Sequence, residues 1–254
     1  VIERWAPAPI APSFVDRPAT AESSVDHVAI VGLDDDALLA LNRERGLSLD
    51  LAELHAVAAF YRDAGREPTD YLNSKLIVMW GWSPADGTFG TNTLQYLKWA
   101  KKQGVRIVCV DPRQTRSSRE LADEHVFIRP STDAAALIAM AYVIASDGLE
   151  DKAYCDRYVL GFDEDHLPPG APAGSSYRSY LLGLADGVRK TPEWAAEITG
   201  IPAETIRRLA VEFATSKPAA LQGGYAPGRT AYGEQFHRAA YALAAITGNV
   251  GIAG

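Results

Sequence analysis

The sequence predicts an α/β fold: a Rossmann-like, mostly parallel sheet with helices on both faces, preceded by a short, mainly helical N-terminal segment. Residues 76–80 are a short apolar run of the kind found in buried parallel strands. Residues 91–102 carry apolar side chains at helical spacing, and residues 105–110 form a second apolar run. This β-α-β order predicts two parallel strands joined by a right-handed crossover.

Composition limits the partners that this chain can have. Its 254 residues allow one large or two modest domains, and 47% hydrophobic with 22% charged residues is typical of globular proteins. The formal net charge of -7 argues against nucleic acid as a partner. No apolar run is long enough to span a bilayer and the first residues do not resemble a signal peptide, so we expect no direct membrane insertion and leave the compartment open.

Two cysteines are present, which is too few for a disulfide framework or an iron–sulfur cluster. Cys109 falls on a predicted strand and Cys155 on a predicted helix. We expect both thiols to be small, buried, apolar side chains.

The chain is expected to divide at residue 70. Within 1–70, proline-rich residues 1–25 predict an extended arm, and two short helices are predicted at 37–45 and 51–64 after a strand candidate at 27–31. Residues 71–254 would form the α/β domain. Its further predicted elements are helices at 134–146, from 192, at 204–215 and at 234–246, and a strand at 219–221.

Ligands of parallel sheets bind at the carboxyl ends of the strands. There the sequence places a glycine-containing loop after the first strand, beginning with Gly81, and a carboxylate, Asp111, at the tip of the second. Such a loop can bring backbone N–H groups to phosphate, and such an acid can accept hydrogen bonds from ribose hydroxyls. The alternative is that these residues only form turns, because the spacing is not G-x-G-x-x-G.

Part of the N-terminal segment resembles the linker region of phosphoribosylformylglycinamidine synthase, a purine-biosynthesis enzyme. The similarity lies in the opening VIERW and in residues 35–70, beyond which that family's Trp-Ser-Glu-His-Cys motif does not follow. The resemblance therefore implies no activity. It supports one alternative function, a non-catalytic linker or interaction segment of such a synthase.

Residues 71–254 resemble the molybdopterin oxidoreductases of the dimethyl sulfoxide reductase family. Six segments match that family's motifs in order, with Ser83 in place of a usual Asn and Ser131 in place of a usual Gly. The matching segments are 73–81, Trp82-Ser83-Pro84-Ala85, Asp111-Pro112-Arg113-Gln114-Thr115, Ile128-Arg129-Pro130-Ser131-Thr132-Asp133, 222–229 and 247–254.

The resemblance implies a molybdopterin guanine dinucleotide cofactor with molybdenum. Asp133 would recognise the guanine edge, while Asp111 and Arg113 would hold ribose and phosphate, with Arg116 and Arg119 able to pair phosphates. Alternatively, 131–133 only cap the helix at 134–146 and the two arginines are solvated. The residues so assigned to cofactor binding are Gly81, Trp82, Ser83, Asp111, Pro112, Arg113, Thr115, Pro130, Thr132, Asp133, Gly223, Gly224, Arg229 and Asn249.

No catalytic residue or metal ligand is assigned, because in this family the molybdenum ligand lies upstream of the matched part. A [4Fe–4S] cluster of the family's N-terminal part would likewise lie outside it. We expect an internal piece of a catalytic subunit, joined artificially to residues 1–70 and inactive by itself. Its expected partners are the remainder of that subunit and an iron–sulfur electron-transfer subunit of anaerobic respiration, in the cytoplasm or periplasm; the substrate stays open.

Overall fold

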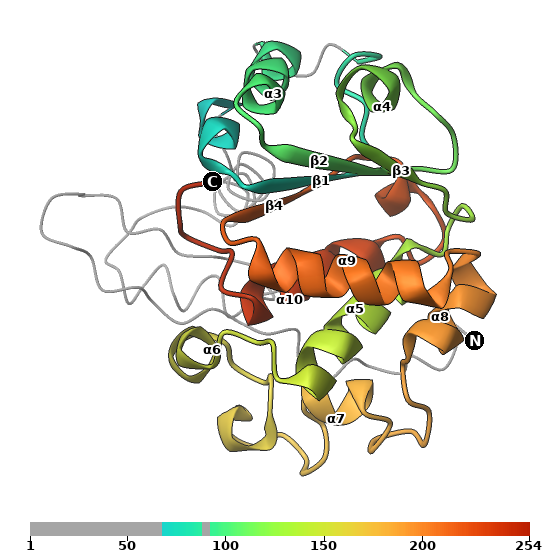
Figure 1. Cartoon of the computed structure of the whole chain (residues 1–254). Helices are drawn as coiled ribbons and strands as arrows, with labels where there is room; N and C mark the ends of the chain where they lie inside the picture. The colour runs from blue at the N-terminus through green and yellow to red at the C-terminus, as the bar shows by residue number, and fades with distance from the viewer. Residues whose placement is uncertain (1–67, 88–91) are drawn as a thin grey trace, which may run out of the picture.

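A computed structural model describes residues 68–87 and 92–254 of the chain (Figure 1). The predicted extended arm, strand candidate and two N-terminal helices lie outside these residues. The described part begins with the 3-10 helix η2, Pro68–Asn73, which buries Tyr71.

Four parallel strands form the central sheet. They are β1, Leu76–Trp80; β2, Arg106–Val110; β3, Glu124–Val126; and β4, Ala219–Gly223. The spatial order is β3-β2-β1-β4, and every neighbouring pair is parallel. All strands therefore end on the same side of the sheet, with Trp80 in register with Val110 and Gly223. We call the residues that end and follow these strands the carboxyl edge.

Side chains of β1 alternate between two buried layers, which is the arrangement expected of a strand covered on both faces. Leu76, Val78 and Trp80 belong to one hydrophobic cluster, while Ile77 and Met79 belong to the other. The helices α3, Thr93–Lys102, and α4, Arg116–Leu121, cover one face (Figure 1). On the other face lie α5, Asp133–Asp147; α9, Ala203–Thr215; and α10, Glu234–Ile246.

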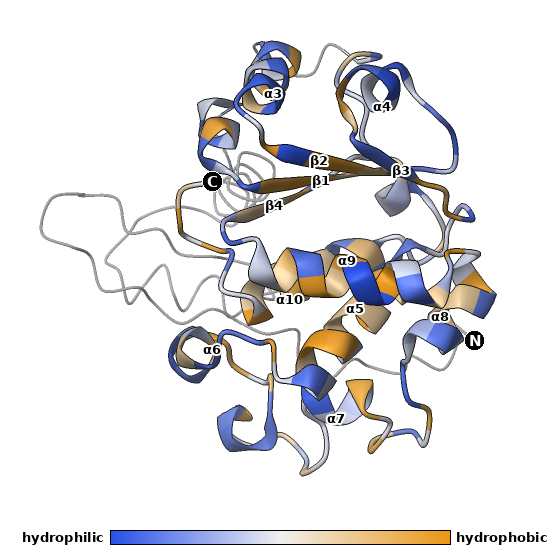
Figure 2. Ribbon diagram, viewed as in Figure 1, coloured by the Kyte–Doolittle hydropathy of each residue, from blue (hydrophilic) through white to orange (hydrophobic). Residues whose placement is uncertain are grey.

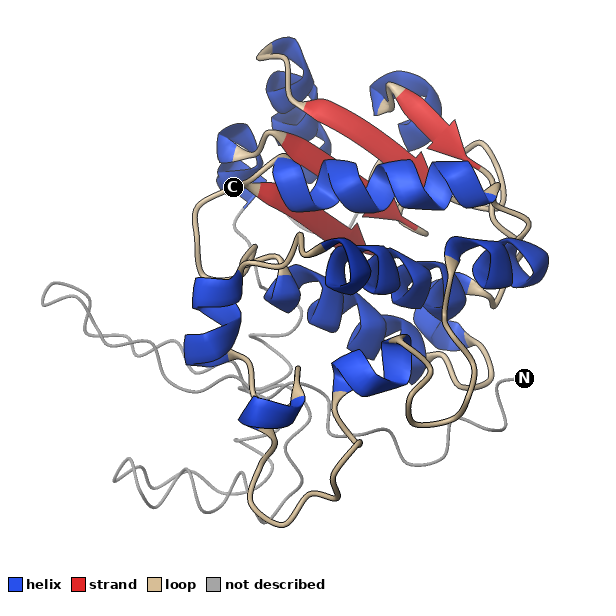
Figure 3. Cartoon of the chain, turned by 60° about the horizontal axis from the view of Figure 1, so that its bottom comes forward, coloured by secondary structure: helices blue, strands red, loops and turns tan. Residues whose placement is uncertain are grey.

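Helix α5 is the centre of the larger layer. Its residues are mostly Ala, Leu, Ile, Met and Val, which Figure 2 colours orange to tan, and most of them are buried. Beyond it lie α6, Lys152–Tyr158; α7, Tyr177–Leu181; and α8, Pro192–Thr199 (Figure 3). Two further 3-10 helices are η3, Glu164–His166, and η4, Pro227–Arg229.

The predicted fold class is confirmed, and the elements predicted among the described residues agree with the structure to within about two residues at each end. Both cysteines are buried and free, as expected. Two details of the strands were wrong. Gly223 is the last residue of β4 rather than a residue after it. Strand β3 was missed, because its three residues EHV carry no apolar run.

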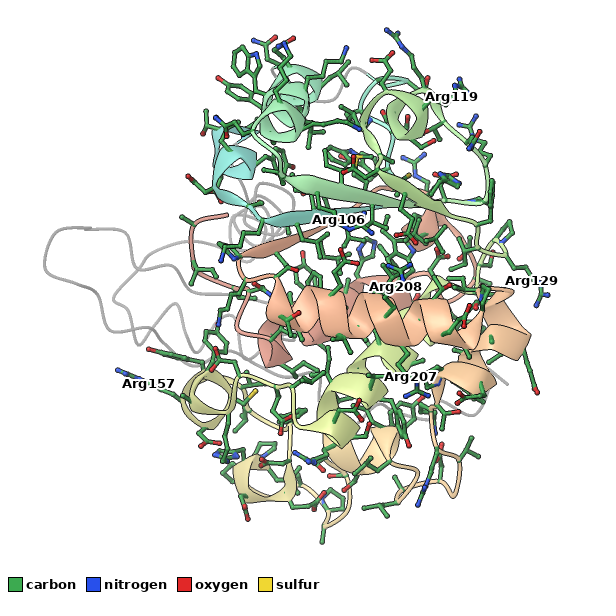
Figure 4. The ribbon with its side chains drawn as sticks, viewed as in Figure 1. Arg106, Arg119, Arg129, Arg157, Arg207 and Arg208 are labelled. Carbon is green, nitrogen blue, oxygen red and sulfur yellow. The ribbon has the colours of Figure 1, made fainter. Side chains whose placement is uncertain are left out.

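Ion pairs close the opposite, amino edge of the sheet. Arg106 at the start of β2 and Arg208 on α9 each pair with both Glu124 and Glu212 (Figure 4). These pairs connect α9 to β2 and β3. Among the described residues, no helix combines the length and apolarity needed to cross a bilayer.

Candidate functional site

The carboxyl edge brings three strand-following segments side by side. Gly81 N donates to Val110 O at 2.8 Å, Asp111 N donates to Val126 O at 3.1 Å, and Gly224 N donates to Trp80 O at 2.8 Å. These bonds continue the parallel ladder one residue beyond each strand. Gly81, the start of the glycine-containing loop, therefore lies beside the end of β2 that leads into Asp111, while Gly90 of that loop lies outside the described residues.

The glycines at this edge allow two backbones to touch. Gly81 has φ +56, a left-handed conformation, and a Cβ on it would lie 2.6 Å from Pro227 Cγ. A Cβ on Gly224 would lie 2.0 Å from the Gly81 carbonyl oxygen, and one on Gly223 would lie 2.8 Å from Phe236. The space beside these glycines is thus filled by protein. Because they carry no side chain, the loops after β1 and β4 can pack directly against each other.

Asp111 organises the turn that follows β2. Its carboxylate is buried, with 7% of the residue exposed, and its Oδ1 accepts from Arg113 N at 2.9 Å. Its backbone carbonyl lies 3.2 Å from His125 Nε2. Pro112 and the Arg113 side chain are exposed. Within residues 68–87 and 92–254 we find no ion pair for the Arg113 guanidinium, although its charge helps to lower the pKa of Asp86.

Ser83 fastens the β1 loop to α4. Its Oγ lies 2.6 Å from Asp86 Oδ2 and 3.0 Å from Ser117 Oγ, and Ser117 also accepts from Ala85 N at 2.8 Å. Asp86 Oδ2 accepts from Arg116 N as well, at 3.2 Å. The hydrogen bond from Ser83 is the main cause that lowers the pKa of Asp86. The hydrogen bonds of Ser83 therefore stabilise the loop after β1 and attach it to α4.

The first turn of α4 uses its polar groups internally. Thr115 is buried and its Oγ1 accepts from Ser118 N at 3.1 Å, which is an N-cap. Arg116 pairs with Glu120 at 2.7 Å, and Arg119 donates to Gln114 O at 3.1 Å. Both arginines are exposed, and Figure 4 shows Arg119 at the outer surface. Their interactions favour the solvated-turn alternative over a phosphate clamp.

Asp133 is the first residue of α5 and is 7% exposed. Its Oδ1 accepts from the Trp80 indole Nε1 at 2.8 Å. Burial is the largest influence on its pKa and raises it; the charge of Asp111 raises it further, while the bond from Trp80 opposes the shift. Sequence reasoning missed Trp80, which it counted only as the end of a strand.

The predicted capping of the helix by residues 131–133 was wrong at Thr132, the residue in the N-cap position. Thr132 occupies the N-cap position but makes no side-chain capping bond; its Oγ1 donates backwards to Arg129 O at 2.6 Å. Ser131 has φ +67, so the chain turns sharply before α5. Pro130 is exposed. Arg129 N donates to Thr199 O at 2.8 Å, which anchors this loop to the end of α8.

The remaining three predicted site residues lie in different places. Trp82 packs near Tyr71, with ring centroids 6.3 Å apart. Arg229 is exposed on η4, and its guanidinium lies 5.5 Å from the centroid of the Tyr225 ring. Asn249 is not at the carboxyl edge. Its Oδ1 accepts at 2.9 Å from the backbone N of Ala219, the first residue of β4.

Asn249 thus lies at the opposite edge of the sheet, about a strand length or roughly 13 Å away. Its Nδ2 donates to Thr247 Oγ1 at 2.9 Å, and Asn249 is 4% exposed. These bonds connect the end of α10 to the start of β4. The Thr-Gly-Asn segment is therefore part of the fold's internal hydrogen bonding.

Comparisons with known proteins agree on one family. The family model "Molybdopterin oxidoreductase" matches residues 50–254. The chain is 45% identical over 193 residues to dimethyl sulfoxide reductase DmsA of Escherichia coli K12, covering 75% of this chain and 24% of that protein. It is 40% identical over 212 residues to the probable dimethyl sulfoxide reductase chain YnfF of the same organism, covering 82% and 26%.

A solved structure is similar too. Acetylene hydratase from Pelobacter acetylenicus superposes with a TM-score of 0.57 at 25% identity, covering 77% of this chain and 26% of that one. This chain therefore spans about a quarter of the length of the relatives it matches. The family match begins at residue 50, upstream of the boundary at residue 70, which stays a prediction.

Proposed function

Because this chain belongs to the molybdopterin oxidoreductase family, we propose that its carboxyl edge binds the guanosine end of a molybdopterin guanine dinucleotide. The family implies a molybdenum–molybdopterin cofactor, which supplies oxygen-atom or electron transfer at the metal when bound. The chain's own part in this is to hold and orient the nucleotide. The parent enzyme would be an oxidoreductase, with this chain supplying one of its cofactor-binding domains.

The observation that carries the proposal is the buried carboxylate of Asp133. Guanine presents two adjacent donors on one edge, the ring N–H and the amino group, whereas adenine presents a donor beside an acceptor. A carboxylate offers two oxygens with about four acceptor positions, of which Trp80 uses one on Asp133 and the backbone of Asp133 itself uses another. An ionised Asp133 therefore fits guanine and repels the acceptor of adenine.

Asp111 and Arg113 fit the sugar and phosphate that follow the base. Asp111 uses one acceptor position for Arg113 N, which leaves others for ribose hydroxyls. The Arg113 guanidinium is exposed beside it and can form paired hydrogen bonds with a phosphate. We assign Ser83, Thr115 and the edge glycines to holding the two loops in place around these groups.

The other parts of the enzyme are also proposals. The pterin, the molybdenum ligand and a [4Fe–4S] cluster would be bound by the remainder of the catalytic subunit, and electrons would come through an iron–sulfur subunit. The substrate class named by the relatives is a sulfoxide or amine N-oxide. The alternative, a linker of a purine synthase, gains no support from the matched family.

The test is calorimetric titration of the full chain with GDP and with ADP. We expect GDP to bind at least about tenfold more tightly, and Asp133→Asn to remove that preference. Asp147→Asn is the matched control, because it makes the same change at the exposed far end of α5. Equal binding of GDP and ADP by the unmodified chain would contradict the proposal.

A further inference from the structure

We propose that Trp80 is a positioning residue that orients the Asp133 carboxylate and thereby sets the preference for guanine over adenine. This inference rests on the proposed function, because it concerns how the same site selects its base. Nothing in the sequence marks Trp80 as more than a strand residue. The geometry around it points to a second role.

The position of the Trp80 ring is fixed from several sides. It is the last residue of β1, 1% exposed, and its backbone is in register with Val110 on β2 and Gly223 on β4. The centroid of its ring lies 6.2 Å from the centroid of the Phe236 ring on α10. A side chain at Gly223 would collide with Phe236, so a glycine at this position leaves the space that the Phe236 ring occupies beside Trp80. The indole N–H therefore points in a single direction.

The Trp80 indole N–H points at the carboxylate of Asp133. The Nε1–Oδ1 distance is 2.8 Å, and the hydrogen bond is buried. A carboxylate on an otherwise unrestrained side chain rotates easily about its last torsion. A rigid donor on Oδ1 fixes the carboxylate plane, so the remaining acceptor positions of both oxygens face a constant direction. Two-point recognition of guanine requires this fixed plane, since both donors must be met together.

The indole also favours the charged form of Asp133. Burial and the neighbouring charge of Asp111 both raise the pKa of Asp133, and the N–H of Trp80 acts against them. A protonated carboxyl would turn a donor toward the donors of guanine. The groups that face Asp133 are thus the neutral donor Trp80 from β1, the carboxylate Asp111 from the turn after β2, and the backbone of Asp133 itself.

The experiment is Trp80→Phe in the full chain, titrated with GDP and ADP between pH 5 and pH 8. The Phe ring keeps most of the packing against Phe236 and lacks the N–H. We expect GDP affinity to fall about tenfold with ADP affinity unchanged, because a hydrogen bond to a charged group is lost. The pH at which GDP binding is half lost should move upward, since the Asp133 pKa rises without its donor.

Two controls separate positioning from loss of stability. Met79→Ala removes a fully buried side chain from the opposite face of β1, so it should destabilise the fold and leave the GDP-to-ADP ratio unchanged. In an Asp133→Asn background, Trp80→Phe should cause no further change in that ratio. The coupling between Trp80 and Asp133 is what this cycle measures.

A second measurement applies even if Trp80→Phe fails to fold. In the 15N-labelled chain, one indole N–H resonance should titrate with the Asp133 carboxyl and should stop doing so in Asp133→Asn. If the chain prefers GDP but neither the indole resonance nor the Trp80→Phe ratio changes, the inference about Trp80 is wrong and the proposed function stands. If the chain shows no GDP preference, the proposed function fails, and the inference fails with it.

Discussion

At the residue scale, the loop into α5 depends on one unusual backbone conformation. Ser131 has φ +67, which costs a residue with a Cβ about 1–2 kcal/mol relative to right-handed backbone. Ser131 is exposed, so no packing offsets this cost. Among residues 68–87 and 92–254, the Ser131 hydroxyl takes no part in the hydrogen bonds that hold Arg129 and Thr132. The loop's shape is therefore set by the contacts around Ser131, and Ser131 itself adds strain.

Replacing Ser131 by Gly should stabilise the chain by about 0.5–1 kcal/mol, because relief of strain exceeds the extra entropy of the unfolded glycine. Chemical denaturation with a linear extrapolation measures this change. Ser146→Gly is the control: it lies in the last turn of α5, where glycine should destabilise by about 0.5–1 kcal/mol. A destabilised Ser131→Gly would show that the Ser side chain supports the loop.

Gly224→Ala should destabilise by about 3 kcal/mol or more, because its Cβ would lie 2.0 Å from a backbone oxygen that cannot rotate away. Gly104→Ala provides the comparison. Gly104 has φ +90 and open space beside it, so only backbone strain of about 1–2 kcal/mol is expected there. Similar losses for both variants would mean that the β1 and β4 loops separate easily.

At the scale of elements, a single carboxylate connects η3 to α7. Glu164 accepts from Gly174 N at 2.7 Å, from Ser176 N at 3.2 Å and from Ser179 Oγ at 2.7 Å. The Ser176 hydroxyl is the largest cause that lowers the pKa of Glu164 from 4.5 to about 2, followed by the Ser179 hydroxyl and then Gly174 N. Hydrogen bonds to the one charged group of Glu164 thus hold together the two ends of the proline-containing segment between η3 and α7.

The lowered pKa gives this connection a defined pH dependence. The ionised form is favoured in the folded chain, so its contribution is complete above pH 4.5 and is lost as the pH falls through about 2. Glu164→Gln should therefore lower the Tm at pH 7, and the difference from the unmodified chain should shrink across that acid range. Thermal unfolding followed at several pH values measures it. A difference that is constant with pH would exclude an ionic cause.

At the scale of the whole molecule, the periodicity of the sequence was enough to predict the parallel sheet and its covering helices. The buried β1 could be read from its apolar run, and so could the meeting of Gly81 with Asp111 at one edge. Chain order alone could not show that Asn249 returns to the start of β4, since that depends on how α10 lies across the sheet.

The directions of the side chains were the other feature of the site that the sequence could not predict. Trp80 and Asp133 are 53 positions apart in the chain, and their hydrogen bond forms because the start of α5 lies beside the end of β1. Sequence patterns identify which face of a strand a residue occupies. They do not identify which polar atom it will meet there. The sequence therefore predicted which loops form the candidate site, but it did not predict the hydrogen bonds within that site.

The central claim is that the carboxyl edge is where a guanine nucleotide binds. The most direct measurement is amide NMR of the 15N-labelled full chain during titration with GDP. The account predicts shifts at Gly81, Asp111 and Asp133, and none at Asn249 on the opposite edge. Shifts confined to Asn249 and its surroundings, or shifts equal for GDP and ADP at the carboxyl edge, would contradict it.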